Sequence, residues 1–221
     1  MTDELLTIET FVERTFGENA FVVSTEDDSG GRVGWVIEPS FPPQVTHLLA
    51  YVADEKITIA RIVLTHGHAD HIAGLDHVHD AHPEAEVAMA AADQPMLADA
   101  NRNLSAPFGL AMTVRTRADT DLVAGMPLSL GRLTWQVLDT SGHSPGGISL
   151  HCPEAGAVFT GDALFAGSIG RADFSDSDGG RLIANIRENL LTLGDETIVY
   201  SGHGPITTIG NERKSNPFLS E

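Results

Sequence analysis

Three histidines and one aspartate lie within six positions of the chain, in the segment 66–71. Imidazole and carboxylate groups are ligands of zinc, iron and manganese, so this density of them indicates a metal site. His66 and His68 are two residues apart and project to the same side of an extended backbone. Asp70 and His71 follow where the chain turns, and they can face a second point nearby. The spacing therefore suits two metal ions better than one.

The elements on either side place this segment between a strand and a helix. Residues 57–64 are β-branched and mostly apolar, which predicts a buried strand. Apolar residues then recur at helical spacing and predict a helix over 70–81, with Asp70 in its first turn. The ligand-type side chains are thus expected where a strand ends and a helix begins.

Three later residues repeat the arrangement of a strand followed by a ligand-type side chain. His143, Asp162 and His203 each follow a short predicted strand, and each has a glycine directly before it. Glycine allows the backbone to approach an ion closely. Each of these signals is weak alone, but four strand ends that together carry seven ligand-type residues indicate one shared site.

Other segments predict elements that flank these strand ends. We expect an alanine-rich helix over 91–100, a long surface loop near a site over 102–125, and a helix over about 181–193. A chain of 221 residues suits one well-buried domain. One domain with helices outside two sheets is the economical arrangement.

The composition limits the partners and the location. Thirteen Lys and Arg residues against 31 Asp and Glu give a net charge of −18, which disfavours nucleic acids and anionic membrane surfaces as partners. No apolar run approaches the roughly 20 residues that span a bilayer. The acidic N-terminus shows no secretory signal, and the single cysteine, Cys152, fits a reducing compartment. We therefore expect a cytoplasmic protein; its oligomeric state stays open.

Together, the motifs resemble those of the metallo-β-lactamase superfamily. The matching segments, in chain order, are THGHADH, SGHSPGG, TGDALF and SGHGP. Within that superfamily the chain is similar to the short, single-domain glyoxalase-II-like (hydroxyacylglutathione hydrolase-like) enzymes, through the segments 161–171 and 202–213. The resemblance implies an α+β fold, the four-layer αβ/βα sandwich of this superfamily. It also implies that residues 1–221 form a single domain, with the metals at one edge of the two sheets.

The resemblance also implies a binuclear metal centre with one shared carboxylate. The implied ligands are His66, His68 and His143 for the first ion, Asp70, His71 and His203 for the second, and Asp162 for both. Zinc is the first expectation for these two divalent ions, with iron or manganese as alternatives. An aspartate at the bridging position points away from zinc β-lactamases that have cysteine there. Two ions against two carboxylates leave a positive centre, which suits an anionic carbonyl substrate.

The implied activity is hydrolysis of a thioester such as S-lactoylglutathione. A hydroxide that bridges the metals would attack the thioester carbonyl, and the thiolate would leave without a strong acid. Asp70 would orient the hydroxide and Asp162 would bridge the ions, so both are predicted to be catalytic. Arg171, in the loop after Asp162, is predicted to contact a substrate carboxylate; a structural ion pair is the competing interpretation.

Two departures from the family pattern limit the prediction of the substrate. Full-length glyoxalase II carries a C-terminal helical domain that binds glutathione, whereas only residues 204–221 follow His203 here. The early strand usually leads into Asp-Pro-Gly, and here it leads into Glu38-Pro39-Ser40. The anchoring role of Glu38 for the metal-side loops is therefore an open question.

Other functions agree with parts of the pattern. A persulfide dioxygenase of the same superfamily would use a single iron on His66, His143 and Asp162, and it resembles the chain in THGHADHI and in residues 171–174. The SGHGP-TTIG tail favours the hydrolase instead. The same centre would also suit hydrolysis of a lactone or a β-lactam. Seven intact ligand residues disfavour a non-catalytic relic, and the charge of −18 disfavours an RNA-processing nuclease.

Overall fold

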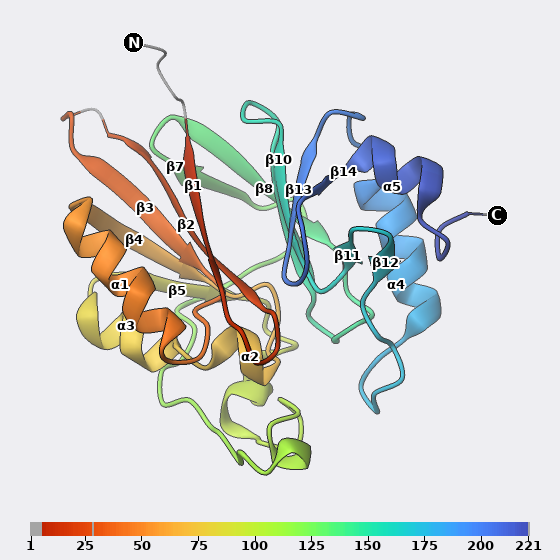
Figure 1. Cartoon of the computed structure of the whole chain (residues 1–221), viewed down its shortest axis with the longest axis horizontal. Coiled ribbons are helices and arrows are strands. Elements are labelled where there is room, and N and C mark those ends of the chain that lie inside the picture. The colour runs from red at the N-terminus through yellow and green to blue at the C-terminus, as the bar shows by residue number, and fades with distance from the viewer. Residues whose placement is uncertain (1–5, 28, 221) are drawn as a thin grey trace.

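The apolar strands of the chain form two six-stranded sheets that pack face to face, with helices on their outer surfaces (Figure 1). The structure is a computed structural model that describes residues 6–27 and 29–220. The layers follow the order helix, sheet, sheet, helix. The predicted α+β sandwich is therefore confirmed.

The first sheet comes from the N-terminal half of the chain. Its strands lie in sequence order, and β3, β4 and β5 run parallel to one another. The carboxyl ends of these parallel strands therefore meet at one edge of the sheet. The strands are β1 (Thr7–Val12), β2 (Asn19–Glu26), β3 (Arg32–Ile37), β4 (Ile57–Val63), β5 (Glu86–Met89) and β6 (Thr120–Asp121).

The second sheet comes from the C-terminal half and has the strand order β14-β13-β10-β9-β8-β7. Its central strands β10 and β13 are parallel, so they also end at the same edge. Its strands are β7 (Pro127–Leu130), β8 (Leu133–Asp139), β9 (Ile148–Cys152), β10 (Ala157–Gly161), β13 (Ile198–Ser201) and β14 (Thr207–Thr208), and a separate hairpin joins β11 (Leu164–Phe165) to β12 (Ser168–Ile169).

Aromatic side chains fill the space between the two sheets. Trp35 of the first sheet packs against Trp135 of the second, with ring centroids 6.0 Å apart. Phe21 and Phe159 form a second contact across the layers at 5.0 Å. All four side chains are buried, so they fix the spacing of the sheets.

Helices cover the outer face of each sheet. On the first sheet lie α1 (Gln44–Asp54) and α3 (Leu75–Ala81), and on the second lie α4 (Gly179–Asn185) and α5 (Ile209–Ser215), as Figure 1 shows. The short helix α2 (Ala69–Ile72) lies at the edge where the parallel strands β3, β4 and β5 end. No helix in the described part of the chain is long and apolar enough to cross a membrane.

The helix predicted over 70–81 is interrupted. It divides into α2 and α3 at Gly74, where the chain passes very close to the segment that precedes α1. A Cβ atom at Gly74 would lie 2.5 Å from the carbonyl oxygen of Ser40 and 2.8 Å from a methyl group of Val45. The contact with the neighbouring segment therefore decides where the helix breaks.

The helix predicted over 91–100 is wrong. The segment forms a turn followed by a short 3₁₀ helix, η1 (Gln94–Ala98), with Pro95 in its first turn. The alanine content favours an α-helix. The buried Asp93 side chain, however, accepts hydrogen bonds from two distant loops, and these bonds determine the local backbone conformation.

Two other local predictions agree with the structure more closely. The segment 102–125 is largely irregular, with a 3₁₀ turn, η2 (Ala106–Phe108), and the short β6. The helix expected over 181–193 is present as α4, which a π-helical turn, η3 (Ile186–Leu190), continues.

Candidate metal centre

Four strand ends deliver all seven predicted ligand residues to one edge of the sandwich. The segment 66–71 follows β4, His143 follows β8, Asp162 follows β10 and His203 follows β13. Six of these side chains form two groups, and the ligand atoms within each group lie within 4.8 Å of one another. The folded chain thus gathers residues that are far apart in the sequence.

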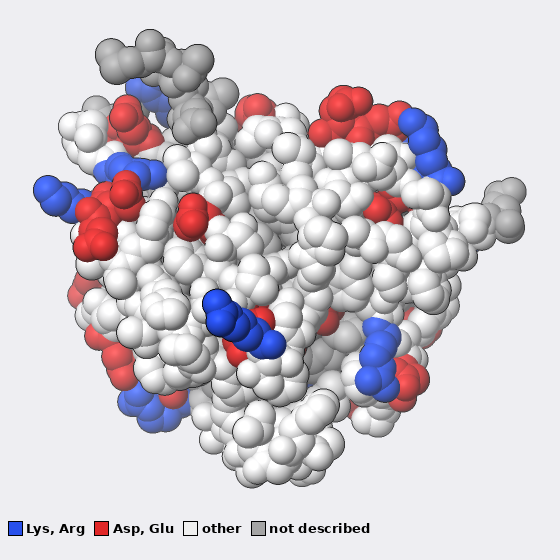
Figure 2. Space-filling view, in the orientation of Figure 1, with Lys and Arg blue, Asp and Glu red and all other residues white. Residues whose placement is uncertain are grey.

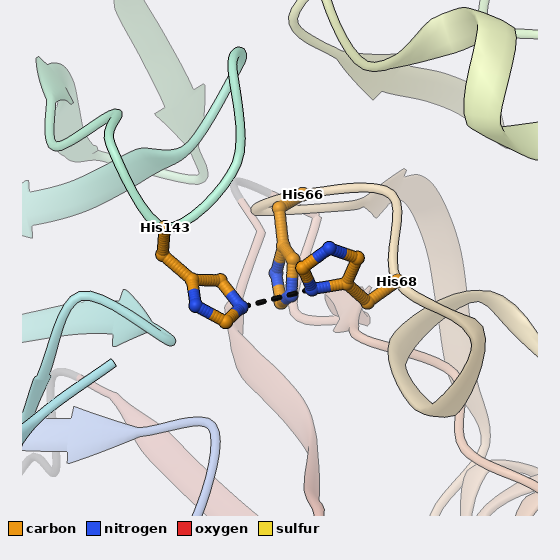
Figure 3. Close-up of side chains that lie close together, drawn as sticks. All are labelled: His66, His68 and His143. Carbon is orange, nitrogen blue, oxygen red and sulfur yellow. Dashed lines mark hydrogen bonds between the residues drawn. The ribbon is translucent and has the colours of Figure 1, made fainter. Parts of the chain in front are cut away.

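The first triad consists of His66, His68 and His143, which point toward one another from two loops, the one after β4 and the one after β8 (Figure 3). His68 Nδ1 lies 2.8 Å from His143 Nε2. His66 Nε2 is buried and has no hydrogen-bond partner among the described residues. A buried ring nitrogen without a partner is costly, and a metal ion at this point would satisfy it.

The second triad consists of Asp70, His71 and His203. His203 Nε2 lies 3.3 Å from Asp70 Oδ2 and 3.3 Å from His71 Nε2. His71 is fully buried, whereas the other two are partly open to the cavity described below. This set offers one carboxylate and two imidazoles to an ion.

Asp162 lies between the triads. Its Oδ1 is 3.3 Å from His71 Nε2 of the second triad, and its Oδ2 is 3.5 Å from His143 Nε2 of the first. Oδ2 is also 3.5 Å from His203 Nε2. Oδ1 is buried and, within the described residues, accepts no hydrogen bond. The geometry suits a carboxylate that bridges two ions.

Gly202 makes the close approach of β10 and β13 possible. A Cβ atom at this position would lie 2.5 Å from Asp162 Oδ1 and 2.7 Å from His71 Cε1. No side chain fits there without moving the central carboxylate. The glycine before His203 therefore shapes the centre.

Oxygen atoms behind three of the imidazoles fix the direction of their rings. His143 Nδ1 donates a hydrogen bond to the carbonyl oxygen of Arg171 at 2.7 Å, and His203 Nδ1 donates to that of Phe16 at 3.2 Å. His71 Nδ1 faces Glu38 Oε2 at 3.0 Å. Each contact leaves Nε2 directed at the centre, which is the usual way that a protein orients metal-binding histidines.

Glu38, whose role the sequence leaves open, lies directly behind both triads. It is buried, accepts a very short hydrogen bond from the Thr65 hydroxyl, and lies 3.8 Å from His66 Nδ1. Its backbone has a positive φ of 59°, an unusual conformation for this residue type. Burial would raise the pKa of its carboxyl group, but His71 and His66 hold that pKa well below its usual range. Glu38 is therefore an ionised support for the second triad.

Histidines of the two triads have pKa values shifted in opposite directions. Burial lowers the pKa of His143 to about 4 and takes the pKa of His68 well below its ordinary value. Burial would also lower the pKa of His71, but the carboxylates of Glu38, Asp162 and Asp70 outweigh it and raise that pKa well above normal. His68 and His143 of the first triad are therefore neutral, whereas His71 of the second lies in a strongly negative environment.

A further buried carboxyl group lies near the second triad. Glu18, just before β2, has both oxygens buried and without hydrogen-bond partners in the part of the chain that the structure describes. Burial raises its pKa well above the ordinary value, with His71, Glu38 and Asp70 as its charged neighbours. The sequence gives no signal for Glu18 because it is an isolated acidic residue in an acidic chain.

Asp93 is a positioning residue that the sequence analysis misses. It is fully buried and accepts hydrogen bonds from the backbone N–H of Gly67 at 3.1 Å and of Gly146 at 2.6 Å. These glycines belong to the two loops that carry the first triad. Asp93 therefore joins these loops, and its place in an alanine-rich segment conceals that role.

A cavity of about 370 Å³ opens over the centre. Its floor includes Asp162 and members of both triads, and aromatic and aliphatic side chains form most of its walls. Arg171 also lines it, and makes two hydrogen bonds, at 2.9 and 2.8 Å, to the Asp173 carboxylate. The guanidinium carbon lies 4.8 Å from the ring centre of Phe174. Arg171 thus lines the cavity while it is paired with an exposed aspartate, and its contact with a substrate stays a prediction.

Comparisons with known proteins agree with this architecture. The sequence profile of the metallo-beta-lactamase superfamily matches residues 15–203. The chain is 31% identical to the hydroxyacylglutathione hydrolase GloC of Haemophilus influenzae, over 97% of this chain and 99% of that protein.

Two solved structures are similar over nearly the whole chain. The BLEG-1 B3 metallo-beta-lactamase has a TM-score of 0.89 and 34% identity, and the match covers 97% of this chain and all of that one. The protein TTHA1623 in a di-iron-bound form has a TM-score of 0.81 and 33% identity, with 96% and 100% coverage. The profile, the relatives and the four-layer fold lead to one conclusion: the chain belongs to the metallo-β-lactamase superfamily of metallo-hydrolases.

Proposed function

We propose that this protein is a metal-dependent hydrolase that cleaves a thioester such as S-lactoylglutathione. The observation that carries the proposal is the position of Asp162 between two triads of metal-ligand residues. The similarity to a hydroxyacylglutathione hydrolase over almost the whole chain supports the choice of a thioester.

The residues fit two divalent ions. The first triad would hold one ion, the second triad the other, and Asp162 both; the buried atoms His66 Nε2 and Asp162 Oδ1 then gain the partner that they lack among the described residues. Zinc is the first candidate, with iron or manganese as alternatives; the di-iron-bound form of the similar protein TTHA1623 supports iron. When bound, such ions supply Lewis acidity, which lowers the pKa of a water molecule and polarises a carbonyl group.

Asp70 is proposed to orient the attacking water. Its side chain is partly open to the cavity, and its Oδ2 lies 3.3 Å from His203 Nε2. Burial would raise the pKa of Asp70, but His71 and His203 lower it to about 2. The carboxylate is therefore ionised at neutral pH and can accept a hydrogen bond from water above the floor. The departing thiolate needs no strong acid, so no separate proton donor is required.

Arg171 is proposed to meet a carboxylate of the substrate at the rim of the cavity. Its ion pair with Asp173 is exposed, and exposed pairs are weak, so a substrate anion can compete for the guanidinium group. If Arg171 contacts a carboxylate in the thiol part of the substrate, the thioester carbonyl lies above the floor of the cavity.

Metal analysis and one assay test the proposal together. Protein purified without added metal should contain close to two equivalents of divalent ion, and it should cleave S-lactoylglutathione with release of the free thiol. One equivalent of iron, with oxygen uptake on glutathione persulfide, would establish the persulfide dioxygenase alternative.

The structural similarity to the BLEG-1 B3 metallo-beta-lactamase makes a β-lactam the second substrate class to test. Cleavage of a β-lactam or a lactone by the two-metal protein, with no cleavage of S-lactoylglutathione, would replace the thioester by that substrate.

A further inference from the structure

The walls of the cavity differ between its two sides. Beside the first triad lie Phe174, whose ring centre is 5.6 Å from that of His68, and Arg171, the only Lys or Arg among the described residues that line the cavity. The opposite side, next to His203, is formed by Phe16, Phe41, Phe108 and other apolar side chains. One side therefore suits a polar or anionic group, and the other an apolar group.

The phenylalanines of the apolar side form a connected surface. The ring of Phe16 stacks on that of Phe41 at 5.5 Å and meets that of Phe108 edge-on at 5.7 Å. The backbone oxygen of Phe16 is the one that accepts the hydrogen bond from His203 Nδ1. This surface, which we call the phenylalanine wall (Phe16, Phe41 and Phe108), thus begins directly at the second triad.

Phe108 and Leu110 are strongly exposed although their segment is held firmly. Their exposed fractions are 67% and 48%. The same segment is fixed by buried Asn103, whose amide group donates to the carbonyl oxygens of Met96 and Met112. Apolar side chains held open over a cavity on a fixed loop are typical of a surface that a ligand covers.

Polar groups on this segment are not available to a substrate. The oxygen of the Asn103 side chain accepts from the backbone N–H of Ser105, and the Ser105 hydroxyl bonds to Met112. Residues 103–112 contain no charged side chain, and the lower edge of the molecule, where this segment lies, is white in Figure 2. A charged or hydroxylated acyl group would lose hydration here and gain no partner.

We propose that the preferred substrate is a thioester with an apolar acyl chain, which lies against the phenylalanine wall while the thiol part points toward Arg171. This inference rests on the proposed thioester hydrolysis and names its substrate class. A lactoyl group carries a hydroxyl and only two carbons beyond the carbonyl, so it leaves most of the wall uncovered. A chain of six carbons covers the wall. Each additional buried methylene should raise kcat/KM by up to about fourfold.

The test compares acyl groups on one neutral thiol, N-acetylcysteamine, with the metal-loaded protein. The series is lactoyl, propionyl, butyryl and hexanoyl, of which lactoyl and propionyl differ only by a hydroxyl group. We expect kcat/KM to rise about two- to fourfold per methylene from propionyl to hexanoyl, and lactoyl to be no better than propionyl.

The Phe108→Ala variant tests whether the phenylalanine wall causes the dependence of kcat/KM on chain length. Phe218→Ala is the matched control because Phe218 is 52% exposed and lies outside the cavity lining. We expect Phe108→Ala to lower kcat/KM about tenfold for the hexanoyl thioester and less than twofold for the propionyl thioester. Phe218→Ala should leave the series unchanged. Metal content and melting temperature confirm that both variants are folded and loaded.

The outcomes separate the two proposals. Cleavage that does not depend on chain length, or an equal effect of Phe108→Ala on all members, refutes the apolar acyl site and leaves thioester hydrolysis in place. If no member of the series and no S-lactoylglutathione is cleaved by protein with two metal equivalents, the proposed function itself fails.

Discussion

The two triads lie side by side at one edge of the sandwich, yet they are stabilised in different ways. The first contains three imidazoles, two of which burial keeps neutral, and its loops are joined by hydrogen bonds from backbone N–H groups to Asp93. The second contains a carboxylate of its own and lies against the buried Glu38. The first triad is therefore held by loop geometry, and the second by charge.

This difference shows that the same residue type takes its properties from its neighbours. His143 and His71 are both buried, but the pKa of His143 falls to about 4 because of burial, while carboxylates raise the pKa of His71 against the same effect. A cation is attracted more strongly to the second triad, whereas His68 and His143 of the first triad stay unprotonated at neutral pH. The comparison predicts unequal responses to mutation and to pH.

The largest effect is expected from Asp162→Ala, because this carboxylate serves both triads. Metal content should fall from two equivalents to one or less. The kcat/KM for thioester cleavage should decrease by about a thousandfold, since metal ions contribute several kcal/mol to such transition states. Asp173→Ala removes an exposed carboxylate outside the cavity lining; it is the control and should keep both ions. An Asp162→Ala protein that retains two ions and full turnover would refute the bridging role.

The pH dependence of the metal-free protein should distinguish the triads. The folded-state pKa of His143, about 4, is below its ordinary value of 6.5, so its contribution to stability is present above pH 6.5 and is lost as the pH falls toward 4. The loss in free energy of unfolding is on the order of 3 kcal/mol. The pKa of His71 is raised, so its contribution is present below pH 6.5 and is lost as the pH rises through the raised value.

Urea unfolding between pH 4 and pH 9 measures both contributions. His143→Gln should flatten the acidic side of the profile, and His71→Gln the alkaline side. His77→Gln replaces an exposed histidine and is the matched control. If His143→Gln and His71→Gln change the same side, the electrostatic contrast between the triads is wrong.

Glu38→Gln should weaken the second ion selectively. The substitution keeps the shape but removes the negative charge 3.0 Å from His71 Nδ1, and supports of this kind are worth about 10- to 100-fold in metal affinity. Competition with a chelator, followed by elemental analysis, should show one ion lost early and one retained. Equal loss of both ions would mean that Glu38 stabilises the fold rather than the second triad.

Asp93→Asn should weaken the binding of the first ion selectively, and by less than Glu38→Gln weakens that of the second. The amide keeps one oxygen acceptor, but its NH₂ group cannot accept the second of the two backbone hydrogen bonds. The loops of the first triad should loosen, and the affinity for the first ion should decrease by roughly tenfold. The same chelator competition applies, and a preferential loss of the second ion would contradict the role of Asp93.

The sequence predicts the strand ends well because apolar β-branched runs are local and strong signals. It does not predict the break at Gly74 or the 3₁₀ turn at Gln94–Ala98, because a contact with another segment decides each of them. The same reason explains why Asp93 and Glu18 escape notice. Their neighbours at the centre are distant in the chain, and no local pattern marks an isolated carboxyl group as buried.

By itself, the sequence determined the superfamily, the sandwich fold and the seven residues that gather at one edge, because ligand type and spacing are written along the chain. Only the tertiary structure decided that two histidines of the first triad are neutral and that the second triad lies among carboxylates. It also decided that Glu38 supports the second triad and that phenylalanines from separate segments line one side of the cavity. These properties arise from burial and from distances between segments far apart in the chain, which exist only once the two sheets have packed together.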